Sequence, residues 1–416
     1  MGQEPRRLPL HEQLDRPYVA LLELTSLAEY SPDELRSLRS ATKHDRDQQL
    51  EACRKDEGRL KKELDSARTE LKGLNKSSSR DTGDMANHRA SLHVQIAALE
   101  RTLQNRKSER EQIIPAAFEI KLAKLRLVEQ WPERRKEIAR IIEKGRARDR
   151  KHGDIDDIGY RRIAKDPEKD IAGGEQAVRQ MTYGGLMPRE IQAADVQQYV
   201  QRLARRIAEN SDLKVPLHVT VLDSPEISAI SVPGGFLFLS AGLILAAETE
   251  AELAGVLAHE IARIAARHGA RAFQRSLISK MFVPAAQVAT GLLTGGFSNA
   301  GAYYGVNYGF QGLSLLVDRT LVGSSGKYQK EADQLGIQYA WKAGFDSKGF
   351  IAFLDSIAKA KQYSKTASFF RTNPELGERL IDAFSEVQYL PPRENYIVDS
   401  AEFRKTKERL DEYRAR

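Results

Sequence analysis

Cysteine and aromatic residues are scarce in this sequence. One cysteine, Cys53, and two tryptophans occur among 416 residues, and aromatic residues make up 7% of the chain. A single cysteine excludes an intrachain disulfide, but it does not identify the compartment, because secreted proteins can also lack disulfides. Few aromatics combined with 30% charged residues are typical of a helix-rich protein with long solvated helices.

The sequence also lacks a strong charge imbalance. Its 65 basic and 58 acidic residues leave a net charge of +7. No compact cluster of basic and aromatic residues, of the kind that grips nucleic acid, interrupts this mixture. The sequence therefore predicts no nucleic-acid partner.

The start of the chain has no evident export or lipidation signal. Glu23 interrupts the apolar run "YVALLEL", and no small-residue cleavage site follows. Arg6 stands where a myristoylation signal needs Ser or Thr. As written, the chain is predicted to be soluble; a periplasmic or membrane-associated protein is the alternative if a signal peptide has been removed.

Charges are absent from one long segment, residues 281–317. These 37 residues include seven glycines and several polar side chains. A bilayer span wants about 20 predominantly apolar residues, so the segment is a poor candidate for one. We expect a glycine-rich flap over the candidate site, and a weak membrane contact is the alternative.

Two apolar stripes at heptad spacing precede residue 113, separated by the polar segment 75–88. They predict an antiparallel coiled-coil hairpin over about residues 45–113. The hairpin either packs on its own domain or serves self-association or a protein partner. The first stripe, which Glu57 interrupts, contains Leu50, Cys53, Leu60, Leu64, Ala67, Leu71 and Leu74, and the second contains Leu92, Ile96, Leu99 and Leu103.

The pattern changes after the hairpin. Pro115 is expected to interrupt the helical structure, and a basic stretch at 131–154 is typical of a solvated face or linker. Beyond it, the order is helix, strand, a strand–Pro-Gly-Gly–strand unit and two helices, which predicts an α+β domain. We predict a helical N-terminal region at 1–150, this domain at 151–392 and a C-terminal helical tail at 393–416.

Residues 248–271 contain most of a zinc-protease motif. Thr249 and Glu252 form a capping box, and an apolar stripe follows, so a buried amphipathic helix is predicted. In His-Glu-x-x-His on a helix, both histidines bind zinc and the Glu activates the metal-bound water. His259 and Glu260 fit this pattern. Arg263 replaces the second histidine, and a guanidinium has only donors and cannot bind a cation.

This segment and three others resemble metallopeptidase family forty-eight, which contains the CAAX prenyl endopeptidases and the HtpX and BepA proteases. The likeness covers roughly residues 154–392, and the order and spacing of its four motifs make it specific. It implies a mostly helical, gluzincin-like α+β domain with a small sheet. The motifs are the Pro-Gly-Gly strand with "SAGL", "ELAGVLAHEIARIAARHG", "EADQLGIQYAWKAGFD" and "FFRTNPELGERL".

The resemblance also implies a zinc ligand set from which this chain departs. Its third ligand, a Glu, corresponds to Gln329, and Asp333 corresponds to an Asp that orients a zinc-binding histidine. A histidine usually near the site is replaced by Asn373. His259 is thus the one surviving metal-ligand position, whereas zinc needs three protein ligands. The candidate catalytic residues are Glu260, Asp333 and Arg379.

Other residues are not expected to replace the lost ligands. His268 and Glu331 are predicted to face away from the metal position, since only residues three or four apart share a helical face. A count of formal charges gives −1 for the zinc site and also for Arg263, Gln329, Glu260 and Asp333 together. We therefore predict Arg263 to be an internal cation, paired with Glu260 and Asp333.

Three functions follow as alternatives. The preferred one is a pseudopeptidase without cofactor that binds polypeptide or unfolded protein in an inherited groove. A residual zinc endopeptidase with Glu260 as general base is the second, and a purely structural coiled-coil protein is the third. In the first, an extended peptide is expected to add to an edge strand formed by Phe236, Leu237, Phe238 and Leu239.

Overall fold

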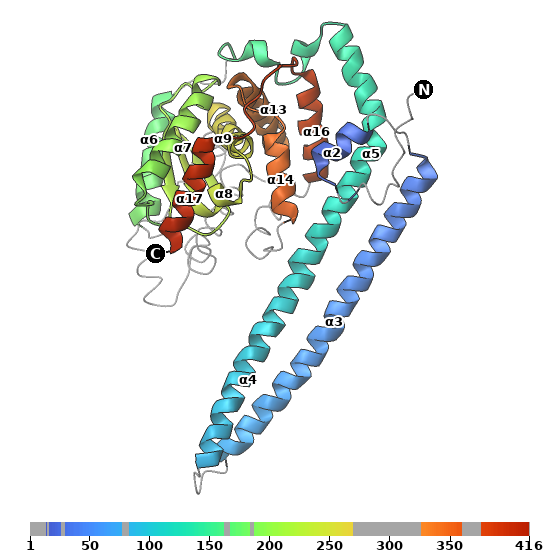
Figure 1. Ribbon diagram of the computed structural model, residues 1–416, viewed down its shortest axis with the longest axis vertical. Helices are drawn as coiled ribbons and strands as arrows, with labels where there is room; N and C mark the ends of the chain where they lie inside the picture. Colours follow the sequence, from blue (N-terminus) through green and yellow to red (C-terminus); the bar gives the residue numbers. More distant parts are fainter. Residues whose placement is uncertain are drawn as a thin grey trace.

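The chain forms a helical body from which a long helical hairpin projects (Figure 1). The computed structural model describes residues 14, 16–25, 30–76, 83–161, 167–183, 187–268, 326–359 and 376–415. Within these ranges, no helix combines the length and apolar character needed to cross a bilayer. The predicted fold, a mostly helical α+β domain with a small sheet behind an antiparallel hairpin, is confirmed.

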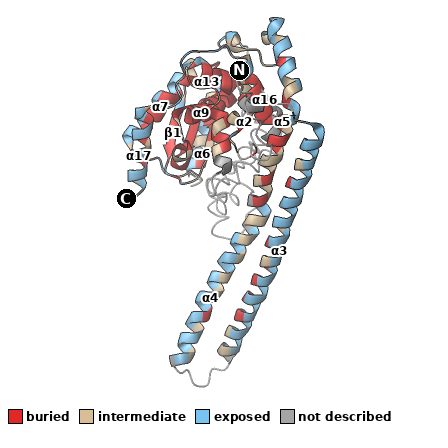
Figure 2. Cartoon of the chain, turned by 45° about the vertical axis from the view of Figure 1, so that its right-hand side comes forward, coloured by how far each residue is buried: buried red, intermediate tan, exposed pale blue. Residues whose placement is uncertain are grey.

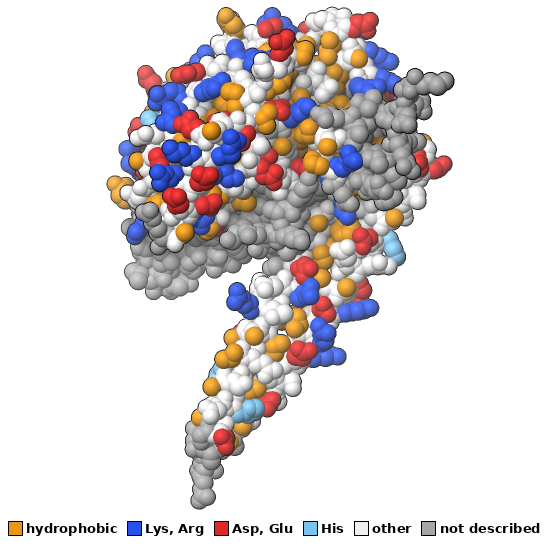
Figure 3. Space-filling view, in the orientation of Figure 1, with side chains coloured by type: hydrophobic (Ala, Val, Ile, Leu, Met, Phe, Trp, Pro, Cys, Tyr) orange, Lys and Arg blue, Asp and Glu red, His pale blue; other side chains and the backbone are white. Residues whose placement is uncertain are grey.

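The hairpin consists of α3 (Pro32–Lys76) and α4 (Gly83–Ser108). Ion pairs between Arg68 and Glu100 at 2.6 Å and between Glu70 and His88 at 2.9 Å join the antiparallel arms. Its first helix begins well before the predicted residue 45. Apart from the seam, the hairpin is exposed, and charged and apolar side chains mix along its surface (Figures 2 and 3).

Glu57 occupies a position in the buried seam between the two arms. It follows Cys53 by four residues and precedes Leu60 by three, and all three side chains are buried. Its carboxylate accepts a hydrogen bond from Arg110 Nε at 2.6 Å. The residue that interrupted the predicted stripe is therefore part of the seam, where an ion pair replaces an apolar contact.

The helix continues beyond α4 through a π-helix, Glu109–Ile113, into α5 (Ile114–Glu143). Pro115 has no N–H and cannot bond to the carbonyl four residues earlier. A π-helical turn directly before the proline accommodates this loss. The predicted interruption at Pro115 is therefore wrong, because the helix changes its hydrogen-bonding period without ending.

One hydrophobic core extends across the predicted boundary near residue 150. It contains Tyr18 of α2 (Tyr18–Thr25) and Trp131 of α5 as well as the buried residues of the later domain. Phe403 of α17 (Ala401–Ala415) also belongs to it. Helix α5, called the hairpin root from here on, and the C-terminal helix thus pack as parts of the body.

The sheet has three strands, β1 (His218–Leu222), β2 (Ala229–Val232) and β3 (Phe236–Ser240). Their order is β1-β3-β2, and β3 pairs parallel with β1 and antiparallel with β2. The expectation that Phe236–Leu239 forms an edge strand is wrong, because both of its sides are paired. Its unbroken apolar sequence is typical of a strand buried on both faces.

Helix α9 (Glu250–Ala265) lies at the centre of the body, and all of its residues are buried. Two neighbouring helices approach its backbone at glycines. A Cβ added to Gly336 would lie 2.9 Å from His259 Cα, and one added to Gly255 would lie 2.5 Å from Phe350 N. The remaining elements are α6 (Pro167–Tyr183), α7 (Ala194–Glu209), α8 (Ala241–Ala246), α13 (Gly326–Lys342), α14 (Gly349–Lys359), α16 (Leu376–Tyr389) and the 3-10 turns Ala147–Asp149 and Ile155–Asp157.

Candidate functional site

Helix α9 begins as its sequence predicts. The Thr249 side chain accepts a hydrogen bond from Glu252 N at 3.3 Å and caps the helix. The return bond of the predicted capping box is displaced by one residue, since Glu252 accepts from Glu248 N at 2.9 Å. This start places His259 and Glu260 in the third turn of α9, with His259 next to α13.

His259 is held on two sides. Its ring stacks on Phe350 of α14, with centroids 4.9 Å apart and planes 11° from parallel. Its Nδ1 lies 2.9 Å from a carboxylate oxygen of Asp333 on α13. A carboxylate in this position fixes the orientation of the imidazole, as the family resemblance implies for Asp333.

Asp333 is bound from the other side by Arg379 of α16. The guanidinium donates through Nε at 2.7 Å and Nη2 at 2.8 Å to the two carboxylate oxygens. Burial by itself would raise the pKa of Asp333, but the charge and hydrogen bonds of Arg379, with His259, lower it to about 2. Arg379 therefore holds the Asp333 carboxylate, and this carboxylate in turn lies against His259.

Arg263 and Glu260 are neighbours on α9. Arg263 Nη1 lies 3.5 Å from Glu260 Oε1, and both side chains are buried. The other carboxylate oxygen of Glu260 is also buried and has no hydrogen-bond partner. The predicted pairing of Arg263 with Glu260 is thus present, whereas the counter-ion of Asp333 is Arg379.

The residues present do not fit a zinc ion. A cationic guanidinium stands beside Glu260, one helical turn after His259, where a second neutral imidazole would be needed. Gln329 offers only an amide oxygen, which is a weak zinc ligand beside imidazole and carboxylate. No group of three or more His, Cys, Asp or Glu side chains in the described ranges could hold a metal ion.

His268 and Glu331 contact each other. His268 Nε2 lies 3.0 Å from one carboxylate oxygen of Glu331, and His152 Nδ1 lies 3.6 Å from the other. The cluster joins the end of α9, the start of α13 and the segment after α5. Sequence reasoning treated His268 and Glu331 separately and missed His152, which no motif marked.

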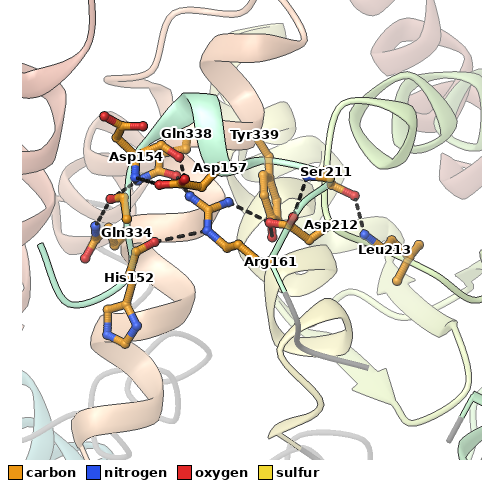
Figure 4. Close-up of polar contacts among 12 residues, drawn as sticks. His152, Asp154, Asp157, Arg161, Ser211, Asp212, Leu213, Gln334, Gln338 and Tyr339 are labelled. Atoms are coloured by element: carbon orange, nitrogen blue, oxygen red, sulfur yellow. Dashed lines mark hydrogen bonds and ion pairs between the residues drawn. The ribbon is translucent and has the colours of Figure 1, made fainter. Parts of the chain in front are cut away.

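A buried polar network fastens residues 150–161 to α13. Figure 4 shows Arg161 between Asp212 on one side and Gln338 on the other, with both bonds at 2.6 Å. Tyr339 also donates to Asp212, at 2.7 Å. Because these groups satisfy one another, the network fixes α13 from the side opposite to Asp333.

The outer edge of β1 is closed by a side chain. Gln197 of α7 donates to Val219 O at 2.6 Å and accepts from Val221 N at 2.8 Å. Ile191 N donates to Val221 O at 2.9 Å. These bonds take the place of a neighbouring strand.

The outer edge of β2 differs. Ser240 N donates to Ser228 O at 3.0 Å, and hydrogen-bonded pairs alternate along an antiparallel ladder. In the observed register, Ile230 and Val232 therefore bond to β3, and the backbone groups of Ala229 and Ser231 point outward. Within the described part of the chain, these outward groups form no backbone hydrogen bond.

Two of the predicted features cannot be placed. The uncharged segment 281–317 and Asn373 lie outside the described residues. The remaining predicted site residues fall into two groups, namely His259, Glu260, Arg263, Asp333 and Arg379 around α9, and Phe236, Leu237, Phe238 and Leu239 in the central strand.

A zinc-protease helix beside a three-stranded sheet, with a carboxylate behind the first motif histidine, defines a metallopeptidase-type domain. Residues 191–386 match the model of Peptidase family M48. The family predicted from the sequence motifs is thereby confirmed.

Curated relatives each match about half of the chain. The beta-barrel assembly-enhancing protease of Yersinia pestis is 28% identical over 227 residues, 54% of this chain and 45% of the relative. The putative beta-barrel assembly-enhancing protease of Vibrio cholerae is 30% identical, over 47% of this chain and 40% of the relative. The mitochondrial metalloendopeptidase OMA1 of Schizosaccharomyces pombe is 32% identical over 44% of this chain and 50% of the relative. The chain thus spans half or less of each relative.

Proposed function

We propose that this chain is a pseudopeptidase, an M48 domain that binds polypeptide without zinc. The observation that carries the proposal is Arg263, buried in the motif helix 3.5 Å from Glu260. A guanidinium stays protonated in proteins and presents only donors. It repels a metal ion at the position where the family needs a ligand.

Charge balance supports the same function. Asp333 is neutralised by Arg379, and Glu260 has Arg263 as its neighbouring cation. With histidine neutral, these four charged side chains and Gln329 sum to zero. A buried site needs paired charges, and here the pairing requires no metal.

The unpaired outer edge of β2 is the feature on which polypeptide binding is proposed, and it belongs to a strand in which Ile230, Ser231 and Val232 are buried. An extended peptide can pair with the outward N–H and C=O groups of Ala229 and Ser231, as in β-strand addition. β2 is the neighbour of Phe236–Leu239 in the sheet, so we propose strand addition at β2 in place of the strand predicted from the sequence.

The class of polypeptide is inferred from the relatives. Ile230 and Val232 are buried with Met181 of α6 in a small core cluster that holds β2 in place. The names of the bacterial relatives, which refer to β-barrel assembly, favour strand-forming clients.

Proline substitution tests the proposed edge. Proline at Ala229 or Ser231 removes an outward N–H and leaves the bonds to β3 intact, so the fold is expected to survive. Binding of an apolar, strand-forming peptide should be lost, as measured by fluorescence anisotropy. Exposed Thr182→Ala, on α6, is the matched control. Unchanged peptide affinity in both proline variants would refute strand addition at β2.

A residual zinc endopeptidase is the second candidate. The unpartnered oxygen of Glu260 and the support of His259 by Asp333 favour it, because a general base and an oriented ligand are retained. Metal analysis of the purified chain separates the two candidates. About one zinc per chain with chelator-sensitive proteolysis would establish the enzyme, whereas the pseudopeptidase carries little zinc and cleaves nothing above background.

The proposal also includes a binding role for the hairpin and a cellular compartment. The exposed hairpin offers a long surface for self-association or for a protein partner. The bacterial relatives act on β-barrel assembly by name, which favours a periplasmic protein over a cytoplasmic one. Deletion of the hairpin should separate partner binding from peptide binding, and a reporter fusion would identify the compartment.

A further inference from the structure

Helix α16 carries three polar side chains on one face, each bonded to α13. Arg379, Asp382 and Glu386 are spaced three and four residues apart, which places them in one row. Arg379 binds Asp333, Asp382 lies 3.1 Å from Lys330 Nζ, and Glu386 accepts from Gln338 at 2.9 Å. The row attaches α16 to α13 along the helix that carries Asp333 and Gln329.

The same helix is bonded to the root of the hairpin. Arg134 of α5 donates to Asp382 at 3.2 Å, so this carboxylate bridges α5 and α13. Trp131 of α5 meets Phe384 edge to face, with ring centroids 4.9 Å apart. Arg150, just beyond α5, pairs with Glu386. Figure 1 shows α16 between α13 and α5.

Because α5 continues the hairpin helix through the π-helix, the helix runs without a break from α4 to Trp131, and Pro132 follows directly. A displacement of this helix displaces Trp131 and, through the helical turn at Pro132, Arg134. Helix α16 must follow or lose buried contacts, since packed interiors do not deform continuously. Arg379 moves with α16, and it determines the position of Asp333 against His259.

We propose that α16 is a coupling helix that makes the geometry of Asp333 and His259 depend on the position of the hairpin root. A protein that grips the hairpin would then change the site from a distance. By linkage, a ligand at the site would change the hairpin root in return. The inference depends neither on peptide binding nor on the loss of zinc.

The test removes the exposed ion pair between Arg134 and Asp382, which joins α5 to α16. The Arg134 and Asp382 side chains are 38% and 35% exposed, so Arg134→Ala and Asp382→Asn should fold. The readout is the imidazole nitrogen shift of His259 at fixed pH, measured with ¹⁵N-labelled histidine and assigned with a His259→Gln variant. Asp333→Asn gives the direction of the shift when the carboxylate support is lost.

We expect Arg134→Ala and Asp382→Asn to move the His259 signal in the direction of Asp333→Asn, and Arg134→Lys to restore part of the shift. Arg202→Ala is the matched control, because Arg202 pairs with exposed Glu402 on α17, away from α5 and α16. A His259 signal identical to wild type in both variants, while Asp333→Asn moves it, would overturn the proposal. An equal shift in Arg202→Ala would overturn it as well, because the effect would then not pass through α16.

Discussion

His259 Nδ1 lies 2.9 Å from Asp333, and Arg379 binds the same carboxylate with two hydrogen bonds. The structure therefore preserves the support of a metal-binding histidine although its partner ligands are changed. Such support has its own stability, because the buried Asp333 carboxylate accepts two hydrogen bonds from Arg379. Retention of Asp333 can thus be explained by folding as well as by function.

Asp333→Asn should destabilise the fold at neutral pH and much less in acid. The carboxyl pKa falls from 3.8 to about 2 on folding. The stability from its charge is therefore present above pH 3.8 and is lost as the pH falls through about 2. We expect a loss of about 3 kcal/mol at pH 7, because buried Arg379 loses its counter-ion. Urea unfolding at pH 7 and pH 2.5 measures this difference, and an equal loss at both pH values would contradict it.

Zinc binding should require two substitutions. Arg263→His alone supplies two histidines, whereas Arg263→His with Gln329→Glu supplies two histidines and a carboxylate beside the retained base Glu260. Calorimetric titration should therefore show tight zinc binding only in the double variant. Gln334→Glu with Arg263→His is the matched control. Equally tight binding by the wild type would show that our placement of the third ligand is wrong.

Glu252→Gln should stabilise the protein above neutral pH. Burial, the largest effect, and the charge of Glu248 raise the pKa of Glu252 to about 7. For this acid, the contribution to stability is complete below pH 4.5 and is lost as the pH rises through about 7. Gln keeps an acceptor for Glu248 N, so we expect a gain of up to about 3 kcal/mol at pH 8. Thermal unfolding at pH 8 and pH 4.5 checks this, with exposed Glu209→Gln as control.

Shortening the hairpin should leave the body folded. Replacing residues 61–102 by a short glycine-rich loop joins the arms near Leu60 and Leu103 and keeps the Glu57–Arg110 pair. The removed seam contacts are satisfied within the hairpin. Near-ultraviolet circular dichroism should therefore match the full chain. Loss of soluble expression would show that the distal hairpin is needed for the core, and removing only residues 61–76 serves as a disruptive control.

Local patterns predicted the parts of the fold that depend on neighbouring residues. The cap at Thr249 and the two apolar stripes of the hairpin follow from spacings of three and four residues. Glu57 was misinterpreted because its partner Arg110 is 53 residues away. A charge in a stripe looks like an interruption until its counter-ion is placed.

The order of strands could not be obtained from local patterns. The strand–turn–strand unit predicts that β2 and β3 pair, but it does not indicate that β1 joins β3 on the other side. A signal was available, since "FLFLS" is apolar at nearly every position and an edge strand more often alternates. The role of Arg379 depends on a contact across 46 residues, and spacing alone could not reveal it.

Gln197 has a consequence for assembly, because it closes the β1 edge. A sheet with one closed edge can pair with only one further strand or sheet. Two molecules can pair edge to edge through β2. A third molecule then finds no unpaired edge, so a continuous sheet cannot grow by this route. The closed β1 edge in this way prevents polymerisation through the sheet.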